Sequence, residues 1–202
     1  MKKFITLALA LCMALSASIC TSAAEIDTDG GSGSTPVYLS STEDGTMEGD
    51  PSATAMSVTV PTALPMAMSQ TGDVTTADNC QIINNSYGAV RVKSVTISAE
   101  NGWSLTAFGN KSTLASEKVD SDQLGFAICI GDGEWAVTDN SNESAQALIS
   151  APINGCYMSG AGNSANNTVS VDYAAIVTPL STPVTNANIA NVVFVVEWDI
   201  AA

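Results

Sequence analysis

The chain has 202 residues, with 20 acidic side chains, six basic ones and no histidine, so its formal net charge at pH 7 is −14. So few Lys and Arg residues exclude the electrostatic footprint of a nucleic-acid-binding protein and disfavour binding to an anionic lipid surface. Without histidine the chain lacks the commonest catalytic base and the commonest metal ligand, so we expect no enzyme, no cofactor and no metal site.

Residues 1–24 have the features of a secretory signal peptide. A start with two lysines precedes an apolar run from Phe4 to Ile19, and small residues follow up to Ala24. The run is shorter than the roughly 20 residues that a membrane-spanning helix needs. We therefore predict a secreted protein, cleaved after Ala24 and without a transmembrane segment in its mature form. Cleavage removes both lysines and no acid, which moves the net charge to −16.

Residues 25–52 are rich in Gly, Ser and acidic residues and poor in apolar ones. This composition predicts a flexible acidic leader. The fragments Asp27–Gly30 and Asp132–Glu134 look like parts of a calcium loop, but neither completes the pattern, so we interpret them as turns. The other acids also stand among Gly, Ser and Asn, where burial is not expected to tune a carboxylate pair for glycoside hydrolysis.

Residues 53–202 alternate apolar and polar side chains with a period of two, which predicts strands. The alternation is clearest in three sets: Met56, Val58 and Val60; Leu124, Phe126, Ile128 and Ile130; and Val169, Val171, Tyr173, Ala175 and Val177. Some eight to ten strands over roughly 150 residues predict an all-β fold, a single antiparallel β-sandwich or Greek-key barrel. A short helical turn is expected at residues 114–119.

Two predicted strands depart from simple alternation of apolar and polar residues. In residues 89–98 the apolar face steps from Val92 to Val95, an odd interval that predicts a β-bulge near Lys93 or Ser94. The last strand, residues 189–200, is apolar on both faces. It is interpreted as a buried central strand, with an edge strand that links subunits as the alternative.

Three cysteines remain after cleavage: Cys80, Cys129 and Cys156. An exported protein can form one disulfide among them, in any of three pairings. Their spacings match no zinc or redox motif, and buried small apolar residues are an equally good interpretation.

Two short motifs repeat one spacing. Trp103 and Leu105 follow an Asn-Gly turn, and Trp198 and Ile200 stand near the end of the chain. Period two puts each pair on one sheet face, where the rings are expected to anchor the core. Trp135 follows a Gly-Asp-Gly turn and is the best single candidate for a surface contact, with core packing as the simpler alternative.

Together with the preceding Val60–Pro61 segment and Phe108, these motifs resemble the WxL domain of Gram-positive surface proteins. The resemblance covers most of residues 55–202 and implies a non-enzymatic protein held non-covalently to the cell wall. Peptidoglycan or other cell-surface proteins are the implied partners, and Trp103, Leu105, Trp198 and Ile200 are the implied structural residues.

Two other functions are compatible with the sequence. The first is an exported subunit of an extracellular fibre or matrix, of the TasA and camelysin type, which assembles when the last strand or the leader pairs with a neighbouring sheet. The second is a carbohydrate-binding module. It would need an array of exposed aromatic residues, for which Tyr38, Tyr87, Tyr157 and Trp135 are the only candidates.

Overall fold

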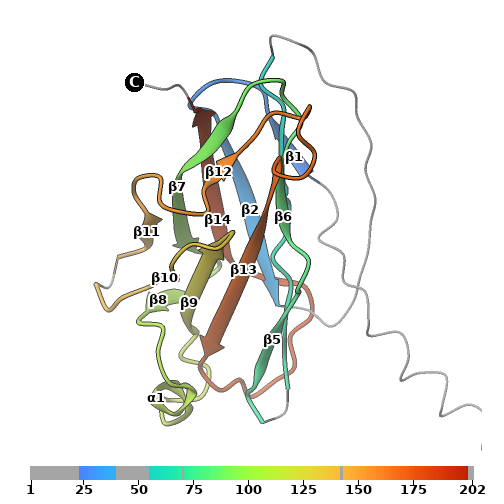
Figure 1. Cartoon of the computed structure of the whole chain (residues 1–202). Coiled ribbons are helices and arrows are strands. Elements are labelled where there is room, and N and C mark those ends of the chain that lie inside the picture. The colour runs from blue at the N-terminus through green and yellow to red at the C-terminus, as the bar shows by residue number, and fades with distance from the viewer. Residues whose placement is uncertain (1–22, 40–54, 70, 142, 200–202) are drawn as a thin grey trace, which may run out of the picture.

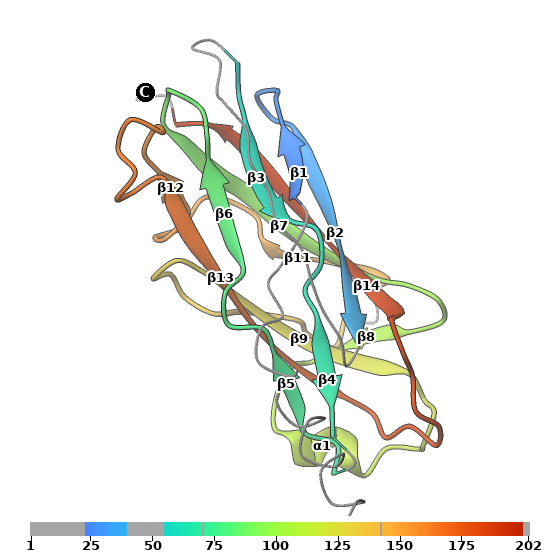
Figure 2. The same ribbon diagram turned by 90° about the vertical axis from the view of Figure 1, so that its right-hand side faces the viewer.

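The protein is a sandwich of two seven-stranded sheets (Figure 1). The computed structural model describes residues 23–39, 55–69, 71–141 and 143–199. Antiparallel pairs dominate both sheets, and among the described strands only β2–β4 and β8–β9 run parallel. The predicted all-β sandwich is therefore confirmed. Figure 2 shows the same two layers turned by 90°.

The first sheet has the strand order β1-β3-β6-β13-β9-β10, and β8 also pairs with β9. Its strands are β1 (Ala23–Ile26), β3 (Val58–Pro61), β6 (Gln81–Asn84), β8 (Ser104–Thr106), β9 (Gln123–Ile130), β10 (Ala136–Val137) and β13 (Thr168–Val177).

The second sheet has the order β11-β7-β14-β2-β4-β5, and β12 also pairs with β7. Its strands are β2 (Ser32–Leu39), β4 (Met66–Met68), β5 (Val74–Thr76), β7 (Val90–Ala99), β11 (Ala145–Ile149), β12 (Tyr157–Met158) and β14 (Ala187–Trp198). The helix α1 (Lys111–Ala115) lies at one end of the sandwich. It begins three residues before the predicted helical turn and ends within it, because Leu114 is the apolar side chain that it buries.

The core lies between the sheets and follows from the period-two pattern. Strand β13 alternates half-buried and buried residues along its whole length. Phe126 of β9 stacks with Tyr173 of β13, with ring centroids 6.1 Å apart. The Tyr173 hydroxyl donates to the Pro65 carbonyl (2.6 Å) and accepts from the Ala77 amide (3.1 Å). This buried phenol thus fixes the segments that flank β4 and β5.

The predicted bulge is confirmed at Lys93. Val195 of β14 lies opposite Ser94, and the next residue, Val196, lies opposite Val92, so Lys93 is the extra residue of β7. The insertion returns Val95 to the core face that Val92 already occupies, and both are fully buried.

The last strand is confirmed as a central strand. On one side β14 pairs with β7 from Ala190 to Trp198, and on the other it pairs with β2 from Ala187 to Val195. Its edges are thus occupied within the chain along most of its length. This contradicts the alternative in which the strand is an exposed edge in the single chain.

The predicted flexible leader is wrong for residues 25–39, because this segment completes both sheets. Strand β1 pairs with β3, a turn follows, and β2 pairs with β14 (Figure 2). Gly33 is needed at a close approach, since a Cβ there would lie 2.9 Å from a methyl group of Val60. The buried Thr35 hydroxyl donates to the Pro61 carbonyl. The sandwich therefore includes strands from Ala23 onward and does not begin at residue 53.

Residues 40–52 of the predicted leader and residues 1–22 of the predicted signal peptide lie outside the described residues. The predicted cleavage after Ala24 falls within β1, where Ala23 pairs with Pro61 and Ala24 with Val60. A chain that began at Glu25 would keep only half of this strand.

Candidate functional site

The first Trp motif forms a corner after β7. Asn101 and Gly102 adopt positive φ angles of 52° and 88°, and the Trp103 amide donates to the Glu100 carbonyl at 3.0 Å. This tight turn directs the chain into β8, where Leu105 is 4% exposed. Trp103 is half-buried and packs against the core. The predicted role of this motif as a core anchor agrees with this placement.

The second Trp motif closes the other end of β14. Trp198 is half-buried, packs against the core and pairs with Val90. Its amide donates to the Asp29 carboxylate (2.8 Å) in the β1–β2 turn. Gly88 lies against the ring, since a Cβ at this position would be 2.8 Å from it. Ile200, the last residue of the motif, lies outside the described residues.

The structure does not bring the two motifs together. Trp103 follows the end of β7 at Ala99, which pairs with Ala190, whereas Trp198 pairs with Val90 at the start of β7. Nine residue steps along a strand correspond to about 30 Å. The two rings therefore anchor opposite ends of the β7–β14 pair and do not form one binding site.

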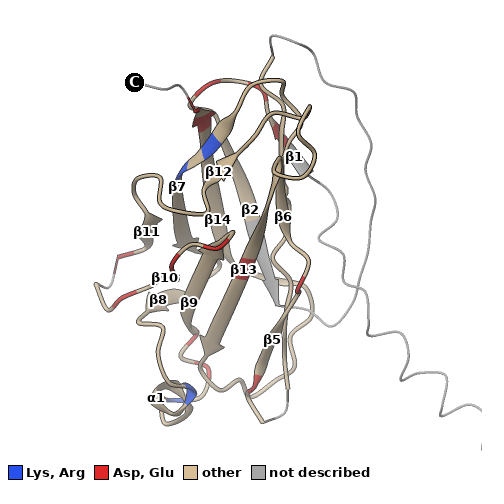
Figure 3. Ribbon diagram, viewed as in Figure 1, with Lys and Arg blue, Asp and Glu red and all other residues tan. Residues whose placement is uncertain are grey.

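A cluster of charged side chains lies beside Trp198 on β7 and β14. Arg91 contacts Glu197 at 2.9 Å and Asp199 at 3.3 Å, and the Lys93 ammonium contacts Glu197 at 2.9 Å. Hydrogen bonds from Lys93 and Arg91 hold the pKa of Glu197 below its ordinary value. The bond to Glu197 likewise raises the pKa of Arg91. Figure 3 shows how few basic positions the fold carries among its acidic ones.

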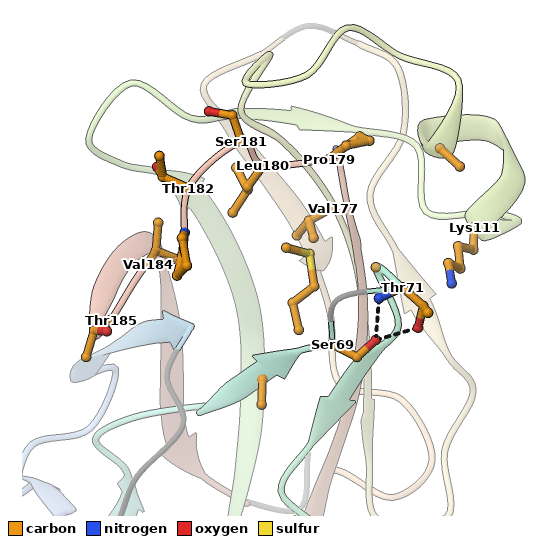
Figure 4. A pocket seen from close by; sticks show the side chains of 15 residues that line it. Ser69, Thr71, Lys111, Val177, Pro179, Leu180, Ser181, Thr182, Val184 and Thr185 are labelled. Atoms are coloured by element: carbon orange, nitrogen blue, oxygen red, sulfur yellow. Dashed lines mark hydrogen bonds between the residues drawn. The ribbon is translucent and has the colours of Figure 1, made fainter.

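A pocket of about 640 Å³ opens at the α1 end of the sandwich (Figure 4). It lies between the β4–β5 turn, α1 and the segment that follows β13. Apolar and hydroxyl side chains line most of it, among them Val177, Leu180, Val184, Ser69, Thr71, Ser181, Thr182 and Thr185. Sequence reasoning did not find this pocket, because Ser and Thr are too common in the chain to be singled out.

The polar groups at the pocket are engaged with one another. The Ser69 and Thr71 hydroxyls lie 2.8 Å apart, and Thr71 donates to the Asp73 carboxylate at 2.6 Å. Lys111 contacts the other oxygen of that carboxylate at 2.6 Å. The Lys111 hydrogen bond, followed by that of Thr71, lowers the pKa of Asp73. Asp73 is therefore an ionised, well-solvated carboxylate, unlike a base tuned to neutral pH.

Among the described aromatic side chains three are exposed: Tyr87 (61%), Trp135 (53%) and Tyr157 (48%). Trp135 thus lies at the surface, as a contact residue requires, and the alternative of core packing is wrong. The three residues come from different places: the β6–β7 connection, the β9–β10 turn and β12. The side chain of Tyr38, the fourth candidate, lies outside the described part of the chain.

Cys129 and Cys156 are buried and have free thiols, so none of the three predicted disulfide pairings is formed. Burial raises the pKa of both thiols, which keeps them protonated at neutral pH. Cys129 and Cys156 fill space as small apolar residues, as the second interpretation of the sequence has it, whereas Cys80 is disulfide-bonded.

No protein-family profile, curated protein or solved structure matches this chain. Over the ranges that the structure describes, no helix has the length and apolar character to cross a membrane. In the same ranges, no three Cys, Asp or Glu side chains gather closely enough to hold a metal ion. The resemblance to the WxL domain remains a prediction from the sequence.

Proposed function

We propose that this chain is a secreted, non-enzymatic protein of the bacterial cell surface, held non-covalently to a Gram-positive cell wall through a WxL-like β domain. The observation that supports this proposal best is that buried polar side chains of the protein form hydrogen bonds with its own backbone. Several buried polar side chains fasten loops and strand ends, as they do in a rigid scaffold.

Three examples show this use. The Asn84 amide donates to the carbonyls of Gly88 and Ser159, each at 2.8 Å, and so ties two loops together. The Thr138 hydroxyl accepts from the Phe126 amide and donates to the Thr106 carbonyl. The Gln146 amide bonds both the N–H and the carbonyl of Asp139. A side chain that satisfies backbone groups in this way supports stability, because an unpaired buried group costs about 1–3 kcal/mol.

The negative charge of the protein opposes its binding to a cell wall. A mature chain with a net charge of −16 is repelled by the anionic polymers of a Gram-positive wall. Asp27 and Asp29 of the β1–β2 turn are exposed, as are Asp132 and Glu134 of the β9–β10 turn. Such carboxylates can share divalent cations with wall phosphates, so the proposal includes cation bridging between protein and wall.

The test is a pelleting assay of the processed chain with isolated Gram-positive sacculi. Pelleting that needs sacculi and is reversed by a chelator is the expected result. A chain that stays in the supernatant with sacculi would contradict the wall-binding proposal. Binding that a chelator leaves unchanged would contradict cation bridging alone. Trp135→Ala tests the exposed ring, and Tyr87→Ala, which removes another exposed ring in the β6–β7 connection, is the control.

A second candidate function is an exported subunit that assembles into a fibre or matrix through strand pairing. One observation favours it: the N-terminal segment, which could have been an independent leader, is a strand on the edge of β14. Pelleting without sacculi that rises with protein concentration would support this function over wall binding.

A further inference from the structure

We propose that the pocket at the α1 end of the sandwich binds a neutral amphiphile, a molecule with an apolar chain and an uncharged, hydroxylated head. The apolar chain lies on the floor of the pocket, and the head lies among the hydroxyl groups at its mouth. The residues that line this pocket belong to neither Trp motif, so the inference does not depend on wall binding.

The pocket has the size and the construction of a small-molecule site. Its volume of about 640 Å³ falls within the roughly 300–1,000 Å³ of typical ligand sites. Three segments that are far apart in the sequence build its walls: the end of β4 with the β4–β5 turn, α1, and the connection between β13 and β14. An apolar lining with a few polar groups at its edge is typical of such sites.

The floor of the pocket is apolar. Val177, at the end of β13, is 7% exposed and fixes the bottom of the pocket. Met68 and Leu180 pack against the core and keep part of their surface exposed. Val184, in the β13–β14 connection, is 37% exposed. Covering these side chains removes apolar surface from water, which favours an alkyl chain as the part of the ligand that enters.

The mouth of the pocket carries hydroxyl groups on two sides (Figure 4). Ser69 and Thr71 lie on one side, and Thr182 and Thr185 lie on the other. All four residues are exposed. A hydroxyl group donates one hydrogen bond and accepts two, so even Ser69 and Thr71, which bond each other, can accept from a ligand. A head with several hydroxyl groups fits this arrangement.

The charges around the pocket favour an uncharged head. Lys111 is the one charged residue among the described residues that line the pocket, and its ammonium lies 2.6 Å from the Asp73 carboxylate. An anionic head would have to displace Asp73, and a chain with a net charge of −14 repels it. A cationic head would meet the Lys111 ammonium. A neutral head leaves this ion pair in place.

The wall that follows β13 is held in position before any ligand binds. The Asp120 carboxylate accepts from the amide (2.8 Å) and the hydroxyl (2.6 Å) of Ser181. The Asp120 amide in turn donates to the Pro179 carbonyl at 2.8 Å. These bonds fix the part of the wall that carries Leu180. A preformed wall lowers the ordering cost of binding.

The test compares three probes by isothermal titration calorimetry on the chain as the cell processes it. Octyl glucoside, kept below its micelle concentration, has an alkyl chain and a neutral hydroxylated head, whereas glucose lacks the chain and octanoate has an anionic head. We expect saturable binding of octyl glucoside at one site, and binding of the other two at least about tenfold weaker. Octyl glucoside that does not saturate, or that binds no more tightly than glucose or octanoate, would overturn the proposal.

A pair of matched variants places the probe in the pocket. Val184→Asn puts an amide in the apolar wall, and Val137→Asn makes the same change at an exposed valine of β10, outside the pocket. Because both valines are exposed, both variants should keep the melting temperature of the unsubstituted chain. We expect Val184→Asn to weaken the binding of octyl glucoside by about fivefold and Val137→Asn to leave it unchanged. Equal affinities of the two variants would overturn the assignment to this pocket.

A second variant closes the pocket from the side of the helix. Ala115 lies on α1, is exposed and lines the pocket, so the ring in Ala115→Trp would take up space at the mouth. We expect this variant to lose octyl glucoside binding, and unchanged binding would overturn the proposal. Pelleting with sacculi should be unaffected in all three variants, so this proposal and wall binding can each fail without the other.

Discussion

At the residue scale, a glycine decides how Trp198 sits against the fold. A Cβ on Gly88 would lie 2.8 Å and 3.2 Å from two atoms of the indole ring. We expect Gly88→Ala to displace the ring and to lower the free energy of unfolding by about 1–3 kcal/mol, the usual cost of overpacking. Urea denaturation measures the loss. Gly162→Ala is the matched control, because a Cβ there has no atom within 4 Å. Equal midpoints for the two variants would contradict the prediction.

Glu197 makes stability depend on pH. Hydrogen bonds and charge from Lys93 and Arg91 lower its pKa in the folded state from the ordinary value of 4.5. The ionised form is therefore favoured by folding, and this stabilisation is complete above pH 4.5 and is lost as the pH falls below it. We expect Glu197→Gln to reduce the fall in urea midpoint between pH 7 and pH 3.5.

Glu134→Gln is the control for this pH series, since Glu134 is an exposed carboxylate in the β9–β10 turn. It should retain the pH dependence of the unsubstituted chain. A Glu197→Gln variant that follows the same pH curve as the unsubstituted chain would show that the ion pairs contribute nothing measurable, as many surface pairs do.

At the element scale, the bulge in β7 determines which single-residue deletions the strand tolerates. Without Lys93, Val92 is followed by Ser94 and Val95, so strict alternation keeps every core residue of β7 on its present face. Deletion of Lys93 should therefore cost about 1 kcal/mol or less. Deletion of Thr96 makes Val95 and Ile97 adjacent, which turns one of them out of the core, and should cost several times more. Denaturant midpoints compare the two, and equal losses would contradict this account.

The elements that could be predicted from the sequence depend on local side-chain patterns, whereas those that were missed depend on pairing with distant parts of the chain. The odd step from Val92 to Val95 predicted the bulge, because side chains in a strand alternate strictly. Strand β2 was missed because Gly33, Ser34 and Pro36 are poor strand formers. Its pairing comes from β14, about 150 residues further along the chain. The spacing in each Trp motif predicted packing, but the distance between Trp103 and Trp198 depends on which ends of β7 they occupy.

At the scale of the whole molecule, the N-terminal segment is part of the sandwich and not an appendage to it. A chain of residues 53–202 would lack β1 and β2 and would leave the β14 edge from Ala187 to Val195 unpaired. We expect it to unfold with a free energy lower by at least about 3 kcal/mol, since each ladder hydrogen bond contributes about 0.5–1.5 kcal/mol. The open apolar edge should also make it aggregate.

A peptide of residues 23–39, added to the truncated chain in trans, should restore the missing stability, because a ligand that binds only the folded state stabilises it by mass action. The increase in melting temperature should grow with peptide concentration. A peptide of the same composition in scrambled order lacks Gly33 at the close approach to Val60 and the Thr35 bond to Pro61, so it should have no effect. Equal effects of the two peptides, or a truncated chain as stable as the full one, would show that the sandwich is complete without its N-terminal strands.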